Sequence, residues 1–121
     1  MRKVIKVLVA DDSKFIRNRI KESLGNTIFE VAGEASNGEE LLNMASTLCP
    51  DVIIADITMD KYDGIEAMRR IKKNRCDAKF LICSARTDMI HEAMEAGEDD
   101  FILKPYNEEE FISVLNNIIN N

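Results

Sequence analysis

Polar and charged side chains follow four of the short apolar runs in the sequence. Asp11 and Asp12 follow the first of these runs, Asp56 the second, Ser84 the third and Lys104 the fourth. Carboxylates that lie close together raise one another's pKa unless a cation offsets their charge. An all-oxygen site with room for water suits Mg²⁺. If these residues meet in space, they predict a Mg²⁺ site beside one reactive carboxylate.

Asp56 is the best candidate for that reactive carboxylate because it ends a wholly apolar run, 52–55. A carboxylate can take up a phosphoryl group as an acyl phosphate. Lys104 then supplies a positive charge for phosphate oxygens, and Ser84 supplies a hydroxyl donor. Taken singly, each residue has a plainer explanation as a helix cap, turn or loop residue. The prediction therefore depends on their joint placement.

Alternating apolar runs and helical repeats predict the elements that position these residues. Apolar runs predict five strands, at residues 5–10, 29–35, 52–55, 79–83 and 101–103. Segments with apolar residues three and four positions apart predict five helices, at residues 13–24, 39–48, 65–74, 88–96 and 108–120. Five such β/α units favour a flavodoxin-like (βα)5 fold with a five-stranded parallel sheet in the order 2-1-3-4-5. In that order the polar strand ends converge on one edge.

Finer features of the sequence give further expectations. Glu30 and Glu34 place the run 29–35 at a sheet edge, whereas the apolar runs 52–55 and 81–83 suit the buried middle. Apolar spacing predicts one buried face on the first helix and one on the last. These faces consist of Phe15, Ile16, Ile20 and Leu24, and of Phe111, Ile112, Leu115, Ile118 and Ile119. We expect Ser13 and Thr87 to cap helices, and Gly97 to end one in the left-handed conformation.

Length and charge limit the classes of function. The 121 residues suit one domain, 1–121, and a net charge of -6 argues against binding of nucleic acid or anionic membranes. The basic stretch at 69–75 is interpreted as a solvated helix face. Met1 to Lys3 lead directly into the first run, with no signal peptide or membrane span, which favours a cytoplasmic location.

Cysteine and histidine give little support for another kind of metal site. Cys49, Cys76 and Cys83 lack paired spacing and are expected to be reduced, mostly buried thiols. The lone His91 is expected at a helix surface rather than as a ligand.

Four separated segments carry a family resemblance: Leu8-Val9-Ala10-Asp11-Asp12-Ser13, Val52-Ile53-Ile54-Ala55-Asp56, Ser84-Ala85 and Lys104-Pro105. Together with Gly64 they resemble the receiver domain of response regulators in two-component signalling. The resemblance implies that Asp56 is phosphorylated and that Asp11, Asp12, Asp56 and the carbonyl of Thr58 bind Mg²⁺. It makes Lys104 the phosphate-contacting lysine, Ser84 the switch hydroxyl and Phe101 the switch aromatic. A cis peptide is implied at Lys104-Pro105.

The resemblance also implies a signalling domain rather than an enzyme. Its partners would be a sensor histidine kinase or phosphotransfer protein and a downstream effector protein or output domain. The run Asp56-Ile57-Thr58-Met59 and the run Cys83-Ser84-Ala85 are most similar to stand-alone chemotaxis-type regulators. Two departures stand out: Asp60 replaces a proline common in the family, and Phe101 lacks the hydroxyl of the tyrosine found in many chemotaxis members.

A small phosphatase and an electron carrier are the two alternative classes of function. A Mg²⁺-dependent phosphatase with an aspartyl nucleophile usually carries a second acid two residues on, where this sequence has Thr58. A flavodoxin-like electron carrier needs a phosphate-binding loop after the first strand, where Asp11 and Asp12 would repel a phosphate.

Overall fold

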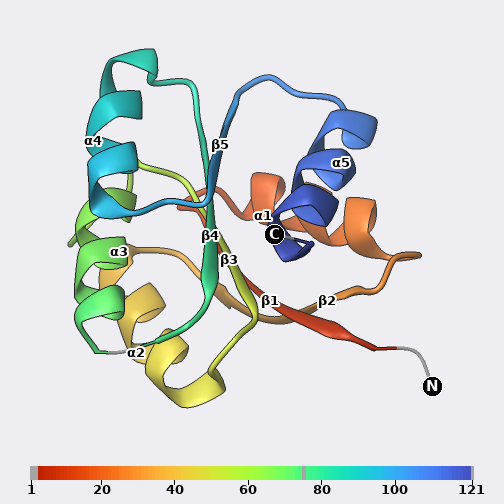
Figure 1. Cartoon of the computed structure of the whole chain (residues 1–121), viewed down its shortest axis with the longest axis horizontal. Helices are drawn as coiled ribbons and strands as arrows, with labels where there is room; N and C mark the ends of the chain where they lie inside the picture. Colours follow the sequence, from red (N-terminus) through yellow and green to blue (C-terminus); the bar gives the residue numbers. More distant parts are fainter. Residues whose placement is uncertain (1–2, 75, 121) are drawn as a thin grey trace.

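The computed structural model describes residues 3–74 and 76–120, and Figure 1 shows the arrangement of its helices and strands. In chain order the elements are β1 Ile5–Ala10, α1 Lys14–Leu24, β2 Phe29–Ala35, α2 Gly38–Leu48, β3 Val52–Ala55, α3 Gly64–Lys73, β4 Lys79–Ser84, a 3-10 helix Thr87–Met89, α4 Ile90–Ala96, β5 Asp100–Leu103 and α5 Glu108–Ile119. The five strands are parallel and lie in the order β2-β1-β3-β4-β5. The predicted elements and strand order are confirmed, with boundaries that differ by one or two residues.

Helices cover both faces of the sheet. In Figure 1, α2, α3 and α4 lie on one side of the strands, and α1 and α5 lie on the other. Because successive strand residues point to opposite faces, Leu8 joins the core under α2, α3 and α4, while Val7 and Val9 join the core under α1 and α5. Burial of each large apolar side chain contributes about 1.5–3 kcal/mol, so both helical layers are firmly attached to the sheet.

The predicted edge and middle strands are confirmed. β2 pairs only with β1, and its Glu30 is exposed. All four residues of β3 are buried, as are Phe80 to Ser84 of β4. A strand covered on both faces cannot solvate polar side chains, which is why Val52 to Ala55 of β3 and Phe80 to Cys83 of β4 are all apolar.

Side-chain caps define where most helices begin. Ser13 accepts from the N–H of Ile16, as predicted, and Asn37, Asp63 and Asn107 cap α2, α3 and α5 in the same way. Gly97 ends α4 at φ 100°, as predicted. The predicted cap at Thr87 is wrong. Thr87 lies inside a 3-10 turn, closed by the Met89 N–H on the carbonyl of Arg86, and no side chain caps α4.

The buried face of α5 is confirmed, but that of α1 is narrower than predicted. Phe111, Leu115 and Ile118 are buried. On α1, Ile20 and Leu24 are buried and Ile16 packs beside them, whereas Phe15 is 67% exposed. Residues 16, 20 and 24 are four apart and form one stripe, and Phe15 lies about 100° around the helix from it. The guanidinium carbon of Arg19 lies 5.8 Å from the centroid of the Phe15 ring.

The remaining surface expectations are partly correct. Arg69 and Arg70 are exposed, but Lys72 packs over the ring of Phe80, and Arg75 lies outside the described residues. All three cysteines are free thiols, yet only Cys83 is buried and Cys49 is exposed, so the prediction of mostly buried thiols is wrong. His91 is 84% exposed on α4, beside Glu95.

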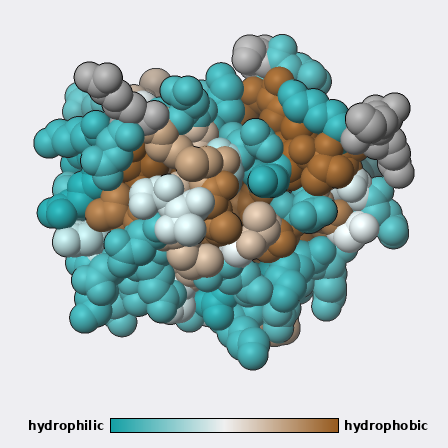
Figure 2. Space-filling view, turned by 90° about the horizontal axis from the view of Figure 1, so that it is seen from below, coloured by the Kyte–Doolittle hydropathy of each residue, from teal (hydrophilic) through white to brown (hydrophobic). Residues whose placement is uncertain are grey.

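Figures 1 and 2 show the two ends of the sheet from different directions. Figure 2 views the molecule from below Figure 1, toward the amino ends of the strands, and shows hydrophobic residues at the surface between hydrophilic ones. The carboxyl ends of the strands lie at the top of Figure 1. The residues with predicted chemistry follow those carboxyl ends. Within the described ranges, no helix is both long and apolar enough to cross a bilayer.

Candidate functional site

The candidate site lies where the central strands end. Asp11 and Asp12 come directly after β1, and Asp56 directly after the neighbouring strand β3. Each of the three aspartates offers a carboxylate oxygen, and these oxygens lie within 4.8 Å of one another. Asp11 is 3% exposed, Asp56 is partly exposed and Asp12 is exposed. The fold therefore forms an acidic cluster that opens toward solvent on one side.

Lys104, one residue beyond β5, reaches into this cluster. Its Nζ lies 3.0 Å from Asp11 Oδ2 and 3.0 Å from Asp56 Oδ2. Burial alone would lower the pKa of Lys104, but hydrogen bonds to Asp56 and Asp11 raise it above its usual value. The ammonium form is therefore favoured, and it supplies one positive charge against three carboxylates.

The two carboxylates bound to Lys104 differ in their second oxygen. Asp11 Oδ1 accepts from the Ser13 N–H at 2.9 Å. Asp56 Oδ1 accepts only a long bond, 3.4 Å, from the Thr58 N–H. A weak bond competes little with a reacting partner, so this oxygen of Asp56 is the one available for attack on an electrophile.

The donor set fits a divalent cation such as Mg²⁺. Three clustered carboxylates with one lysine retain an excess of negative charge, which a hard divalent cation offsets through oxygen ligands. Asp12 is exposed, and among the described residues its carboxylate makes no hydrogen bond or ion pair. It is therefore free to act as a ligand.

The other predicted site residues lie around this cluster. Ser84 is buried at the end of β4; its Oγ accepts from the Arg86 N–H at 3.2 Å, and its carbonyl accepts from the Lys104 N–H at 3.0 Å. Thr58 is exposed in the loop after Asp56. Phe101 is half-buried on β5, packed on the core under α2, α3 and α4. The Lys104-Pro105 peptide is cis.

Two glycines hold the loop between β3 and α3 close behind Asp56. A Cβ on Gly64 would lie 2.1 Å from the Asp56 carbonyl oxygen, and one on Gly38 would lie 2.0 Å from the Tyr62 carbonyl oxygen. Only glycine allows such close approach of two backbones. Gly64 was identified from the sequence, but Gly38 was missed, because its partner Tyr62 is far away in the sequence.

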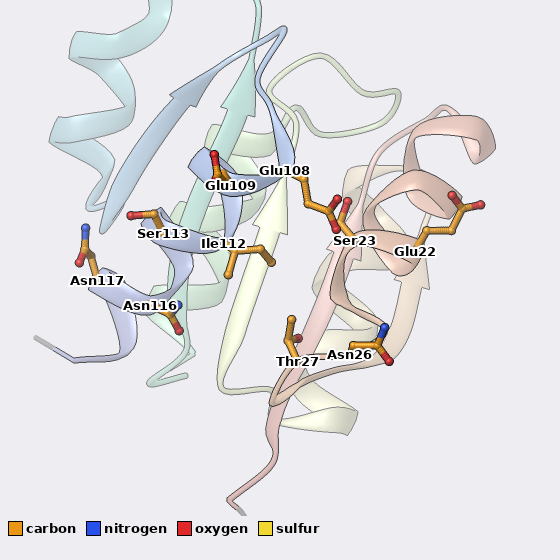
Figure 3. Close-up of a pocket in the computed structure, with 10 residues that line it drawn as sticks. All are labelled: Glu22, Ser23, Asn26, Thr27, Glu108, Glu109, Ile112, Ser113, Asn116 and Asn117. Atoms are coloured by element: carbon orange, nitrogen blue, oxygen red, sulfur yellow. The ribbon is translucent and has the colours of Figure 1, made fainter.

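A pocket of about 580 Å³ lies elsewhere, between the end of α1 and α5. Figure 3 shows Glu22 and Ser23 on one side and Glu109 and Ile112 on the other. It contains none of the predicted site residues. The acidic cluster is therefore separate from this groove.

Five parallel strands in the order β2-β1-β3-β4-β5, with three aspartates and a lysine at their carboxyl ends, define a flavodoxin-like α/β domain with an acidic site. The sequence model of one protein family, the response regulator receiver domain, matches residues 7–116. The chain therefore belongs to this family.

Relatives support the same assignment over nearly the whole chain. The chemotaxis protein CheY of Thermotoga maritima is 39% identical over 115 residues, which cover 93% of this chain and 96% of that protein. CheY of Bacillus subtilis is 36% identical over 117 residues, which cover 95% and 98%. The response regulator domain of Thermotoga maritima CheB has a TM-score of 0.87 and 33% identity, covering 98% of this chain and 96% of that one. The phosphatase alternative finds no support among them.

Proposed function

We propose that this receiver domain accepts a phosphoryl group on Asp56 from the phosphohistidine of a sensor histidine kinase or phosphotransfer protein. The observation that carries the proposal is the position of Lys104, whose ammonium contacts Asp56 and Asp11 beside the third carboxylate, Asp12. A nucleophilic carboxylate, a cation at its oxygen and a cation-binding carboxylate pair are the parts that phosphoryl transfer requires.

In this mechanism Oδ1 of Asp56, the weakly bonded oxygen, attacks phosphorus. An O–P bond forms, and the N–P bond of phosphohistidine breaks with its electron pair left on the histidine nitrogen. Lys104 is 3.0 Å from the other oxygen of the same carboxylate, so its charge stabilises the oxygens of the transferred group. Bound by Asp11, Asp12, Asp56 and the Thr58 carbonyl, Mg²⁺ would offset the negative charge of the phosphoryl oxygens.

We propose that Ser84 and Phe101 couple the phosphorylation of Asp56 to the binding of partners. The Ser84 hydroxyl would give up its bond from the Arg86 N–H and donate to a phosphoryl oxygen, and Phe101 would turn inward on β5. The face formed by α4, β5 and α5 would then change its affinity for an effector protein or output domain. Met94 on α4 and Leu103 on β5 are exposed apolar side chains available for such contacts. Unchanged amide hydrogen exchange on this face after phosphorylation would contradict the switch.

The phosphoacceptor assignment is tested with acetyl phosphate and Mg²⁺, followed by mass spectrometry of the intact protein. We expect the unmodified sequence to gain one phosphoryl group and Asp56→Asn to gain none. Asp60→Asn, an exposed aspartate in the same loop, is the matched control and should be labelled normally. Labelling of Asp56→Asn at the level of the unmodified protein would show that the assignment is wrong.

A further inference from the structure

Arg17 on α1 makes contacts that the proposed phosphoryl chemistry does not itself require. Its side chain is only 13% exposed. Nη1 donates a hydrogen bond to the main-chain carbonyl of Asp11, and Nε donates to Glu34 Oε1 at 3.1 Å. The guanidinium thus connects the first residue of the acidic cluster with the edge strand β2.

Glu34 fixes this guanidinium in place. Its second oxygen accepts from Lys21 Nζ at 3.0 Å, so two bases of α1 hold one carboxylate of β2. The hydrogen bond from Lys21 lowers the pKa of Glu34 most, burial opposes it, and the bond from Arg17 lowers the pKa further, so the net change is downward and the carboxylate form is favoured. A planar guanidinium offers two separate donor edges in fixed geometry, which a lysine ammonium does not.

The contact with the Asp11 carbonyl sets the direction of the following peptide. The N–H of Asp11 already donates to the Ala35 carbonyl at 3.1 Å, and its carboxylate is bound by the Ser13 N–H and by Lys104. The carbonyl bond from Arg17 completes this set and holds the peptide that joins Asp11 to Asp12. Asp12 is exposed, so the main chain before it determines where its carboxylate lies.

We propose that Arg17, anchored by Glu34, is a positioning residue that orients the Asp11–Asp12 peptide and so preorganises the carboxylate pair for a divalent cation. The proposal rests on the proposed Mg²⁺ site. It adds to that site a residue outside the carboxylates, which acts through the backbone. Loss of such outer residues in metal sites typically weakens binding by about 10–100-fold.

The test is titration of the purified protein with MgCl2 by isothermal calorimetry, together with thermal unfolding without metal. Arg17→Ala should weaken Mg²⁺ binding about 10-fold or more. Lys21→Ala is the matched control, because it removes the other partner of Glu34 from the same helix without touching Asp11. Lys21→Ala should leave the Mg²⁺ affinity within about twofold of the unmodified protein, even if it lowers the unfolding temperature. If Arg17 only bridged α1 and β2, the two variants would instead change the Mg²⁺ affinity alike.

The measured affinities distinguish a failure of the role of Arg17 from a failure of the proposed Mg²⁺ site. Equal Mg²⁺ affinity of Arg17→Ala and the unmodified protein overturns the role of Arg17 while leaving the metal site intact. Equal weakening in Lys21→Ala also overturns it. Absence of Mg²⁺ binding to the unmodified protein would instead overturn the proposed metal site. Should Arg17→Ala not fold, Arg17→Lys retains the charge without the two-edged donor, and an unchanged affinity in that variant overturns the inference.

Discussion

The three aspartates of the site have different surroundings, and these suit different roles. Asp11 is buried and bound through its N–H, carbonyl and carboxylate. Asp56 is bound firmly at one oxygen and weakly at the other. Asp12 is exposed. These contacts suit Asp11 to the proposed role of a fixed ligand, Asp56 to that of the reactive carboxylate and Asp12 to that of an adaptable ligand.

Cys49 is a residue whose backbone conformation is unfavourable for its side chain. It ends α2 at φ 46° and ψ 59°, in the left-handed region that favours glycine. We expect Cys49→Gly to raise the free energy of unfolding by up to about 1 kcal/mol, because relief of strain exceeds the added entropy of the unfolded chain. Urea unfolding measures this change. Cys49→Ala removes the thiol but keeps the strain, and an equal gain in both variants would contradict the explanation.

Glu98 gives a pH-dependent prediction. Its Oε2 is buried with no hydrogen-bond partner among the described residues, and burial, followed by Asp100 and Asp99, raises its pKa above 4.5. An acid with a raised folded-state pKa costs stability as pH rises through that pKa. Glu98→Gln should therefore raise the free energy of unfolding at pH 7, by no more than about 1 kcal/mol for this partly exposed group.

The gain from Glu98→Gln should disappear below about pH 4.5, where the glutamate is protonated in both the folded and unfolded chains. Chemical unfolding at pH 7 and pH 4 measures the difference. Glu92→Gln, an exposed glutamate on α4, the helix that ends just before Glu98, is the control and should change little at either pH. A gain for Glu98→Gln that is the same at both values would rule out the titration.

At the level of elements, the loop between β3 and α3 determines the position of Asp56. The Gly64 N–H donates to the Ile57 carbonyl at 2.8 Å, and the Gly38 N–H at the start of α2 donates to the Asp60 carbonyl at 3.2 Å. Arg70 of α3 stacks over Tyr62, 4.0 Å from the ring centroid. Contacts with α2 and α3 thus hold the loop. The loop is supported although Asp60 stands where many members of the family have a proline.

Gly64→Ala should disturb this arrangement. The new Cβ would overlap the Asp56 carbonyl oxygen, so the loop or α3 must shift. We expect the free energy of unfolding to fall by about 1–3 kcal/mol, the usual cost of overpacking, and acetyl phosphate labelling of Asp56 to slow. Gly25→Ala is the control, because its Cβ would have no contact shorter than 3.4 Å and its backbone is helical. Similar behaviour of the two variants would argue against a role for the close approach.

For the molecule as a whole, the acidic cluster lowers the stability of the folded protein when no cation is bound. Three carboxylates meet at the end of a well-packed sheet, and only Lys104 offsets their repulsion within the described residues. A bound cation would stabilise the folded protein by mass action, by about 2.7 kcal/mol at a concentration of one hundred times Kd. Stability and metal binding should therefore change in opposite directions when a carboxylate is removed.

Asp12→Asn tests this coupling. Without Mg²⁺ the variant should be more stable than the unmodified protein, by about 0.5–1 kcal/mol for an exposed charge, because one repelling carboxylate is lost. Addition of Mg²⁺ should raise the unfolding temperature of the unmodified protein but not that of the variant. Asp77→Asn, an exposed residue before β4, should retain the full response. A normal Mg²⁺ response in Asp12→Asn would remove Asp12 from the ligands.

The sequence by itself determined the order of elements, the sheet topology and the meeting of Asp11, Asp12, Asp56 and Lys104. These follow from local apolar patterns and from the rule that parallel strands end at a common edge. The tertiary structure alone decided that Phe15 is exposed, that Thr87 lies in a 3-10 turn, that Gly38 supports Tyr62 and that Arg17 joins Asp11 to Glu34. Such details depend on packing and hydrogen bonds within the folded chain, largely between residues distant in the sequence, and no local pattern encodes those contacts.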